Sequence, residues 1–199
     1  MPTLTATNSL STKLATIKPH IGNTPLLRIE GFHDNENVQI FAKLEWKQLS
    51  GSVKARAAYN IIKNAILENK LTPDKILLDA SSGNTGIAYA TIGKKIGLNV
   101  TILLPENASS ERKNILKSLG AEIIYTSKFR GTDEAQDAAK ELAERYPEKY
   151  FYADQYSNEN NWKAHYHGTA EEIIHEKPQL DYFIAGLGTT GTFVGTSRK

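Results

Sequence analysis

Short runs of apolar residues alternate along the chain with longer segments in which apolar positions recur every three or four residues. A short continuous apolar run indicates a buried strand, and the longer spacing indicates a helix with one buried face. The predicted strands cover residues 39–45, 75–80, 99–104, 121–126, 150–153 and 181–186. The predicted helices cover residues 52–69, 86–96, 110–119, 133–146 and 160–175, with Ser109 and Thr132 capping the third and fourth.

This order of elements predicts an α/β fold. Strands separated by helices of about ten to eighteen residues form right-handed β–α–β units and a parallel sheet. Such sheets bind ligands at the carboxyl ends of their strands. Two turns rich in Gly, Ser and Thr directly follow predicted strands, at residues 81–86 and 186–192. Both turns are therefore candidate ligand sites.

Composition and charge narrow the class of protein. Of the 199 residues, 40% are hydrophobic and 23% charged, as in ordinary globular domains. The sequence has no Cys, which excludes a disulfide framework and fits the cytoplasm. The formal net charge of +2 and the lack of a basic run predict no nucleic-acid partner. No apolar stretch approaches the ~18 residues of a membrane span. We expect residues 1–20 to form a flexible arm.

Lys54 is the first candidate for chemistry. It lies in the first turn of the helix predicted over residues 52–69, where the helix dipole already supplies positive charge. A positive field and burial both lower the pKa of an amine, which favours the neutral nucleophile needed for a Schiff base. A solvated lysine at a helix start is the ordinary alternative, and position by itself does not separate the two.

The two small-residue turns offer anion sites. Ser81-Ser82-Gly83-Asn84-Thr85-Gly86 opens a helix whose free N–H groups suit a carboxylate or phosphate, although a simple helix cap explains the pattern equally well. Gly188-Thr189-Thr190-Gly191-Thr192 offers backbone N–H groups and threonine hydroxyls to a phosphate. His165 and His167 lie two positions apart, on different faces of a helix, so we predict no metal site.

Together these segments form an ordered set of motifs that resembles the cysteine synthase (O-acetylserine sulfhydrylase) and cystathionine β-synthase family of fold-type II pyridoxal-phosphate enzymes. The resemblance runs from about residue 17 to residue 199. The matching motifs are Ile21-Gly22-Asn23-Thr24-Pro25-Leu26, Lys43-Leu44-Glu45, Gly51-Ser52-Val53-Lys54, Ser82-Gly83-Asn84-Thr85-Gly86, Gln155 with Asn158, Ala164-His165-Tyr166 and Gly188-Thr189-Thr190-Gly191-Thr192.

The resemblance implies a fold and a role for each matching residue. It implies two three-layer α/β domains with parallel or mixed sheets: a smaller one over residues 48–159, and a larger one built from residues 1–47 and 160–199 that we expect to be incomplete here, as in a piece of a longer protein. Lys54 would hold pyridoxal 5'-phosphate as an internal aldimine and move the substrate's α-proton. The cofactor ring and phosphate would be bound by Asn84, Gly188, Thr189, Thr190, Gly191 and Thr192. The substrate carboxylate would be bound by Ser81, Ser82, Asn84, Thr85 and Gln155.

The implied reaction is a β-replacement, through an α-aminoacrylate, that makes L-cysteine from O-acetyl-L-serine and sulfide in a cytoplasmic homodimer. Two departures bear on the substrate: Gln48-Leu49 stands where the family usually has Asn-Pro, and Ala55 where it has Asp. Cystathionine β-synthase, or another enzyme that uses an activated serine, therefore stays an alternative. A truncated, non-catalytic binding module is an alternative of another class. A nucleotide-binding α/β domain rests on the Gly-rich turns alone.

Overall fold

The computed structural model describes residues 4–199, with side chains from residue 10 onward. Its strands are β1 (Leu26–Ile29), β2 (Ile40–Lys43), β3 (Ile76–Ala80), β4 (Val100–Pro105), β5 (Glu122–Thr126) and β6 (Tyr150–Tyr152). Its α-helices are α1 (Leu4–Ile17), α2 (Lys54–Leu67), α3 (Asn84–Ile96), α4 (Ser110–Ser118), α5 (Gly131–Arg145), α6 (Glu159–Ala164), α7 (Ala170–Glu176) and α8 (Gly191–Ser197). Shorter turns are the 3-10 helices η1 (Lys18–His20) and η2 (Leu49–Gly51), and the π-helical turn η3 (His165–Thr169).

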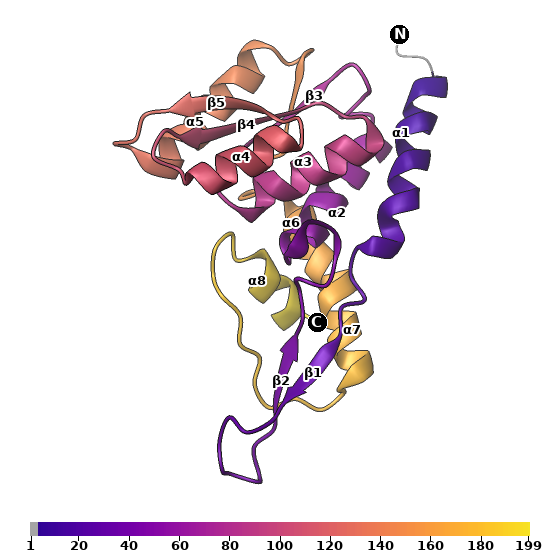
Figure 1. The fold of residues 1–199 in the computed structure, drawn as a ribbon. Helices are drawn as coiled ribbons and strands as arrows, with labels where there is room; N and C mark the ends of the chain where they lie inside the picture. Colours follow the sequence, from indigo (N-terminus) through magenta and orange to yellow (C-terminus); the bar gives the residue numbers. More distant parts are fainter. Residues whose placement is uncertain (1–3) are drawn as a thin grey trace.

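A parallel four-stranded sheet in the order β5-β4-β3-β6 forms the centre of the upper lobe (Figure 1). All four of its strands were predicted from their apolar runs. The register pairs Leu77 with Val100 and with Phe151, so β3 lies between β4 and β6. The carboxyl end of β3 leads directly into the turn at residues 81–83 and then into α3. The predicted α/β fold is thus confirmed for the parallel sheet and for the strand–turn–helix unit that holds the first candidate turn.

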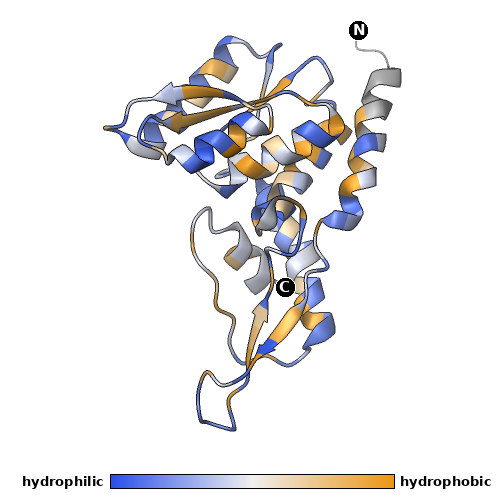
Figure 2. Ribbon diagram, viewed as in Figure 1, coloured by the Kyte–Doolittle hydropathy of each residue, from blue (hydrophilic) through white to orange (hydrophobic). Residues whose placement is uncertain are grey.

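Alternating residues of the sheet feed two separate cores. Leu77 and Ile102 face a large core that they share with α1, α2 and α3. Leu78 and Leu103 face the opposite core, against α5. This alternation is what a strand covered on both faces by helices requires. Figure 2 shows hydrophobic positions concentrated along these strands and on the helix faces that meet them. The described residues include no helix long and apolar enough to cross a membrane.

The lower lobe contains the antiparallel hairpin β1–β2 together with α6, α7 and α8 (Figure 1), and Lys43 of β2 forms ion pairs with Glu172 and Glu176 of α7. Strand β1 was not predicted. The strand predicted at residues 181–186 does not form, and this prediction was wrong. Tyr182 and Ile184 in this segment are 88% and 91% exposed. A strand needs a hydrogen-bonded neighbour, and none of the described strands lies beside this segment.

The structure corrects two further predictions, one for the N-terminal segment and one for the start of α5. The segment predicted as a flexible arm forms helix α1, because Leu10, Leu14 and Ile17 recur on one face and are buried in the large core. Thr132 is not the cap of α5, which starts two residues earlier than predicted, at Gly131, with Arg130 as its N-cap residue. Ser109 does cap α4, since its hydroxyl accepts a hydrogen bond from the backbone N–H of Arg112.

Candidate active site

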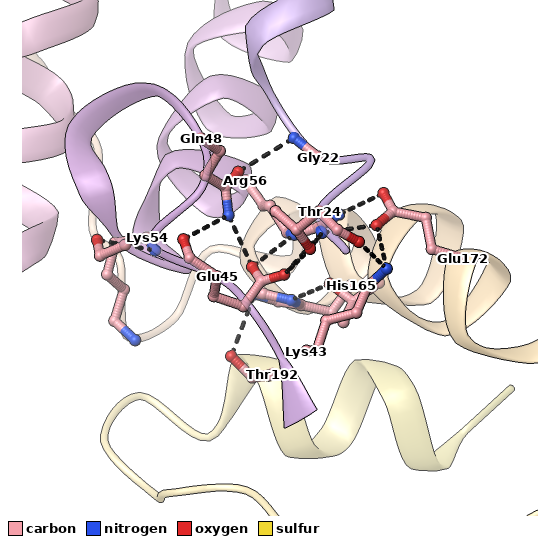
Figure 3. Close-up of polar contacts among 12 residues, drawn as sticks. Gly22, Thr24, Lys43, Glu45, Gln48, Lys54, Arg56, His165, Glu172 and Thr192 are labelled. Atoms are coloured by element: carbon pink, nitrogen blue, oxygen red, sulfur yellow. Dashed lines mark hydrogen bonds and ion pairs between the residues drawn. The ribbon is translucent and has the colours of Figure 1, made fainter. Parts of the chain in front are cut away.

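Lys54 opens helix α2 directly after a strained turn. Ser50 has a φ of 68°, a conformation that costs energy for a residue other than Gly, and the turn carries the chain from η2 into the helix. The Lys54 ammonium points away from the polar cluster of Figure 3, and no hydrogen bond or ion pair to it is found within the described residues. Burial lowers its pKa. Burial is thus the cause of the lowered pKa of Lys54, which stays a candidate nucleophile.

A buried ion network centred on Arg56 holds the same first turns of α2 (Figure 3). Arg56 is 4% exposed, and its Nε and Nη2 donate to the two carboxylate oxygens of Glu45 at 2.7 and 2.8 Å. Its Nη1 and Nη2 donate to the two carboxylate oxygens of Glu172, at 2.6 and 2.8 Å. Nη2 also donates to Thr24 Oγ1 at 3.0 Å. Thr24 and Glu45, residues from two motifs of the sequence, thus have a structural role close to Lys54.

Lys43 and Gln48 complete the network. Lys43 Nζ lies 3.1 Å from Glu172 Oε2 and donates to the Thr24 carbonyl at 2.5 Å. The Gln48 side chain donates to Glu45 Oε2 at 2.7 Å and accepts from the Gly22 N–H at 3.1 Å. Gln48, a departure from the family pattern, therefore links the hairpin to the turn that carries Lys54.

The ion pairs with Arg56 determine the pKa values of the two carboxylates in this network. Burial by itself would raise the pKa of Glu172, but hydrogen bonds from Arg56 and the Asn23 N–H bring it to about 2. At Glu45, too, burial acts to raise the pKa, but the hydrogen bonds from Arg56 outweigh it, and the pKa of Glu45 is lowered. Both carboxylates are therefore ionised at neutral pH, and they offset the charge of Arg56.

The turn after β3 forms the N-terminus of α3, as predicted. The buried hydroxyl of Ser81 accepts from the N–H of Gly83 and of Gly86, at 3.3 and 3.0 Å. Ser81 thus binds a backbone N–H in the first turn of α3, whose N-cap residue is Gly83. Asn84 is exposed, and its side chain has no hydrogen bond among the described residues. Thr85 is buried. Arg112 from α4 donates to the Ser82 carbonyl at 2.9 Å and so brings a cation to this turn.

Gln155 lies beside the carboxyl end of β3. Its Nε2 donates to the Ala80 carbonyl at 2.8 Å, and its backbone N–H donates to Asp79 Oδ2 at 3.3 Å. Both side chains are buried, and burial raises the pKa of Asp79 to about 7. The contact with Ala80 places the predicted Gln155 next to the predicted turn at residues 81–86, although the two are separated by some seventy positions.

The turn before α8 follows the predicted pattern of residues 188–192. Thr190 has a φ of 62° and is the N-cap residue of α8. Thr189 Oγ1 accepts from the side chain of Asn161 at 2.8 Å, and Thr192 Oγ1 lies 3.3 Å from His165 Nε2. A Cβ added at Gly188 would have no heavy atom within 4 Å, so the space beside this turn is open.

His165 lies beside this turn, with its Nε2 facing Thr192. Burial lowers the pKa of His165 to about 3, and the nearby positive charges of Arg56 and Lys54 act in the same direction. The imidazole is neutral, and its Nδ1 lies 2.9 Å from Thr169 Oγ1. Neither His165 nor Asn161 was assigned a site role from the sequence, because a buried polar side chain on a helix carries no distinctive spacing signal.

These residues fit a cofactor that carries an aldehyde and a phosphate. The amine of Lys54 has no partner among the described residues and its pKa is lowered, as a Schiff base requires. The turn at residues 188–192 has open space beside Gly188 and hydroxyls on its threonines, as a phosphate requires. The fold and these residues therefore suit an α/β enzyme that uses a cofactor of this kind.

Comparison with known proteins identifies the family. The model of the pyridoxal-phosphate dependent enzymes matches residues 17–199, and the chain belongs to this family, whose cofactor is pyridoxal phosphate. It is 44% identical over 188 residues to a cysteine synthase from Aquifex aeolicus, a match that covers 92% of this chain and 58% of that protein. It is 38% identical over 186 residues to a cysteine synthase B from Escherichia coli, covering 93% and 61% of the two chains.

Comparison with solved structures supports the same family assignment. A cysteine synthase from Entamoeba histolytica superimposes with a TM-score of 0.85 at 35% identity, over 92% of this chain and 55% of that one. An O-acetylserine dependent cystathionine β-synthase from Helicobacter pylori gives a TM-score of 0.85 at 36% identity, over 92% and 60%. The predicted fold-type II class is confirmed. The chain spans between 55% and 61% of the length of these four relatives.

Proposed function

We propose that the protein catalyses a β-replacement that makes L-cysteine from O-acetyl-L-serine and sulfide. The observation that carries the proposal is the half-buried amine of Lys54 at the start of α2, which has no partner among the described residues, in a chain whose family uses pyridoxal phosphate. When bound, pyridoxal phosphate withdraws electrons from the α-carbon of an amino acid. Cysteine synthases among the relatives support the substrate assignment.

Three parts of the chain would bind the cofactor: Lys54, Asn84 and the turn at residues 188–192. Lys54 would hold the cofactor aldehyde through its neutral amine and, once freed by the substrate amine, would accept the substrate's α-proton. Asn84 would contact the cofactor ring. Gly188, Thr189, Thr190, Gly191 and Thr192 would bind its phosphate.

Substrate binding falls to the turn after β3. The N–H groups at the start of α3 and the side chains of Ser82, Asn84 and Thr85 hold the substrate carboxylate, with Ser81 keeping the turn in shape and Gln155 assisting. Acetate leaves the β-carbon with the electron pair of the C–O bond. Sulfide then forms the new C–S bond, and Lys54 returns the proton to the α-carbon.

A second candidate is formation of cystathionine from homocysteine and an activated serine. It is favoured by the Helicobacter pylori relative, which is described as an O-acetylserine dependent cystathionine β-synthase. Gln48 and Leu49, which replace the usual Asn-Pro beside Lys54, keep this candidate open. Product analysis with O-acetylserine, offering sulfide and homocysteine in competition, separates the two. Cysteine as the main product supports our proposal, and cystathionine overturns the choice of nucleophile.

Borohydride reduction followed by peptide mass spectrometry tests the central step. With pyridoxal phosphate supplied, we expect a pyridoxyl adduct on Lys54 in the wild-type protein and none on that peptide in Lys54→Arg. The exposed Lys47, seven positions earlier, is the matched control, because it shares the sequence neighbourhood and lacks the burial. Equal labelling of Lys47 and Lys54 would show adventitious Schiff bases. No adduct on Lys54 would favour the non-catalytic module.

The proposal extends to assembly and location. We propose that the protein acts on small molecules as a homodimer in the cytoplasm, and that residues 48–159 form its smaller domain. The lack of cysteine supports a reducing compartment. Sedimentation of the purified protein at several concentrations tests the dimer, and a concentration-independent monomer overturns it.

A further inference from the structure

We propose that Asn161 is a positioning residue that fixes the amino-acid side of the site relative to the phosphate side. The inference rests on the proposed function, since it takes Gln155 and Thr189 as residues of those two sides. Asn161 lies in α6 and is 6% exposed. It belongs to neither turn, yet it contacts both.

The geometry uses the whole amide of Asn161. Its Nδ2 donates to the Gln155 carbonyl at 2.8 Å and to Thr189 Oγ1 at 2.8 Å, so both amide hydrogens are engaged. Its Oδ1 lies against Gly191, where an added Cβ would come within 2.1 Å. One buried side chain thus spans from the segment after β6 to the start of α8.

The two ends of this bridge are themselves fixed. Gln155 is held to β3 through Asp79 Oδ2 and the Ala80 carbonyl, which lead into the substrate turn. Helix α6 is tied to α2, which carries Lys54, by a hydrogen bond from Asn60 Nδ2 to the Asn160 carbonyl at 2.8 Å. Asn161 therefore connects the substrate turn, the phosphate turn and the helix of the catalytic lysine.

Few other side chains can replace it. Asp has the same shape but no donor, and its oxygens would face the Gln155 carbonyl. Ala and Ser are too short to reach either partner. Loss of the bridge leaves the Gln155 carbonyl and Thr189 hydroxyl without this partner and frees the two turns to separate. Since a cofactor joined to its substrate must contact both turns at once, both affinities depend on their spacing.

The test compares Asn161→Ala with its neighbour Asn160→Ala. Asn160 is partly buried and its side chain has no hydrogen bond among the described residues, so it is a matched control. The first readout is the dissociation constant of pyridoxal phosphate, measured by absorbance titration of the apoprotein. We expect Asn161→Ala to raise it roughly tenfold and Asn160→Ala to change it less than about twofold.

A second readout is the KM for the amino-acid substrate against kcat. A spacing role predicts a rise of roughly tenfold in KM for Asn161→Ala and a smaller change in kcat, because Lys54 itself is untouched. A role in stability alone would lower the melting temperature and leave both the dissociation constant and KM unchanged below it. That result overturns the proposal.

Asn161→Asp supplies an independent check, because it keeps the shape of the side chain and removes only the two amide hydrogens that form the bridge. It should raise the dissociation constant of pyridoxal phosphate as Asn161→Ala does. An Asn161→Asp protein that binds the cofactor like the wild type overturns the bridge. A wild-type protein that binds no cofactor overturns the proposed function first, and this inference with it.

Discussion

Arg56 and Glu172 lie 116 positions apart in the sequence and meet through two parallel hydrogen bonds, from Nη1 to Oε1 at 2.6 Å and from Nη2 to Oε2 at 2.8 Å. The fork-to-fork geometry is the strongest that a guanidinium and a carboxylate can form. It joins α2, which carries Lys54, to α7 in the lower lobe. Because Glu45 holds the same guanidinium from the hairpin side, one cation fixes three elements around the start of α2.

Replacing this cation should destabilise the fold strongly. Arg56→Met keeps much of the apolar length but leaves Glu45 and Glu172 without their main counter-charge. Removing one partner of a buried ion pair costs about 3–5 kcal/mol. We expect the free energy of unfolding, measured by urea denaturation at pH 7, to fall by about that amount.

The matched control is an exposed ion pair of the same kind. Lys70 and Glu68 lie 2.6 Å apart with side chains 65% and 48% exposed. Lys70→Met should change the free energy of unfolding by less than about 1 kcal/mol. An equally small change in the free energy of unfolding for Arg56→Met would mean that the network does not stabilise the fold.

The sequence predicted the parts of the fold that depend on local pattern. Strands β3 and β4 are continuous apolar runs buried on both faces, so their periodicity was sufficient. The segment at residues 181–186 has the same kind of pattern, but a strand also needs a neighbour, and neighbours are a tertiary property. The burial of Leu10 and Leu14 likewise depends on α2 and α3, which no local rule supplies.

The site was predictable to a similar extent. Lys54 and the turns at residues 81–86 and 188–192 were singled out because helix starts rich in small residues have a characteristic composition, and this holds although the strand predicted before the second turn does not form. The roles of Arg56 and Asn161 depend on partners in distant segments, such as Glu172 and Thr189. Such contacts leave no spacing signal in a single sequence, and they appear when the chain is folded.

Acid should destabilise the protein through Glu172. Its pKa is about 2 in the folded protein, against about 4.3 for a glutamate in an unfolded chain. A depressed carboxyl pKa contributes stability that is complete above the unfolded value and lost as pH falls toward the folded value. We therefore expect the urea midpoint to drop between about pH 4.5 and pH 2.

Glu172→Gln provides the comparison. The variant should be less stable than the wild type at pH 6, and its urea midpoint should fall less steeply over the acid range. Parallel acid curves for the two proteins would mean that Glu172 is not responsible for the loss.

His165 should stay neutral throughout the physiological range. Its pKa is lowered to about 3 by burial, whereas a free imidazole titrates near 6.5. We expect its ring resonances in a two-dimensional NMR spectrum to be constant between pH 5 and pH 8. Since the unfolded chain binds this proton first, His165 also reduces stability as pH falls below about 6.5. A resonance assigned through His165→Gln that titrated with a midpoint near 6.5 would contradict the buried, neutral ring.

The Lys54 amine should react with aldehydes at a lower pH than an ordinary lysine. Its pKa is lowered from 10.5 by burial, so a larger share of it is neutral at any pH below that value. We expect the rate of pyridoxal phosphate attachment to Lys54 to rise with pH and to level off below pH 10.5. Stopped-flow absorbance between pH 6 and pH 10 measures the rate, and Lys54→Arg gives the background from other lysines. Ser52→Ala removes the hydroxyl that accepts from the backbone N–H of Lys54 and leaves the side-chain ammonium untouched. This variant should keep the wild-type midpoint of the pH–rate curve. A rate that followed the background at every pH would mean that burial does not activate this amine.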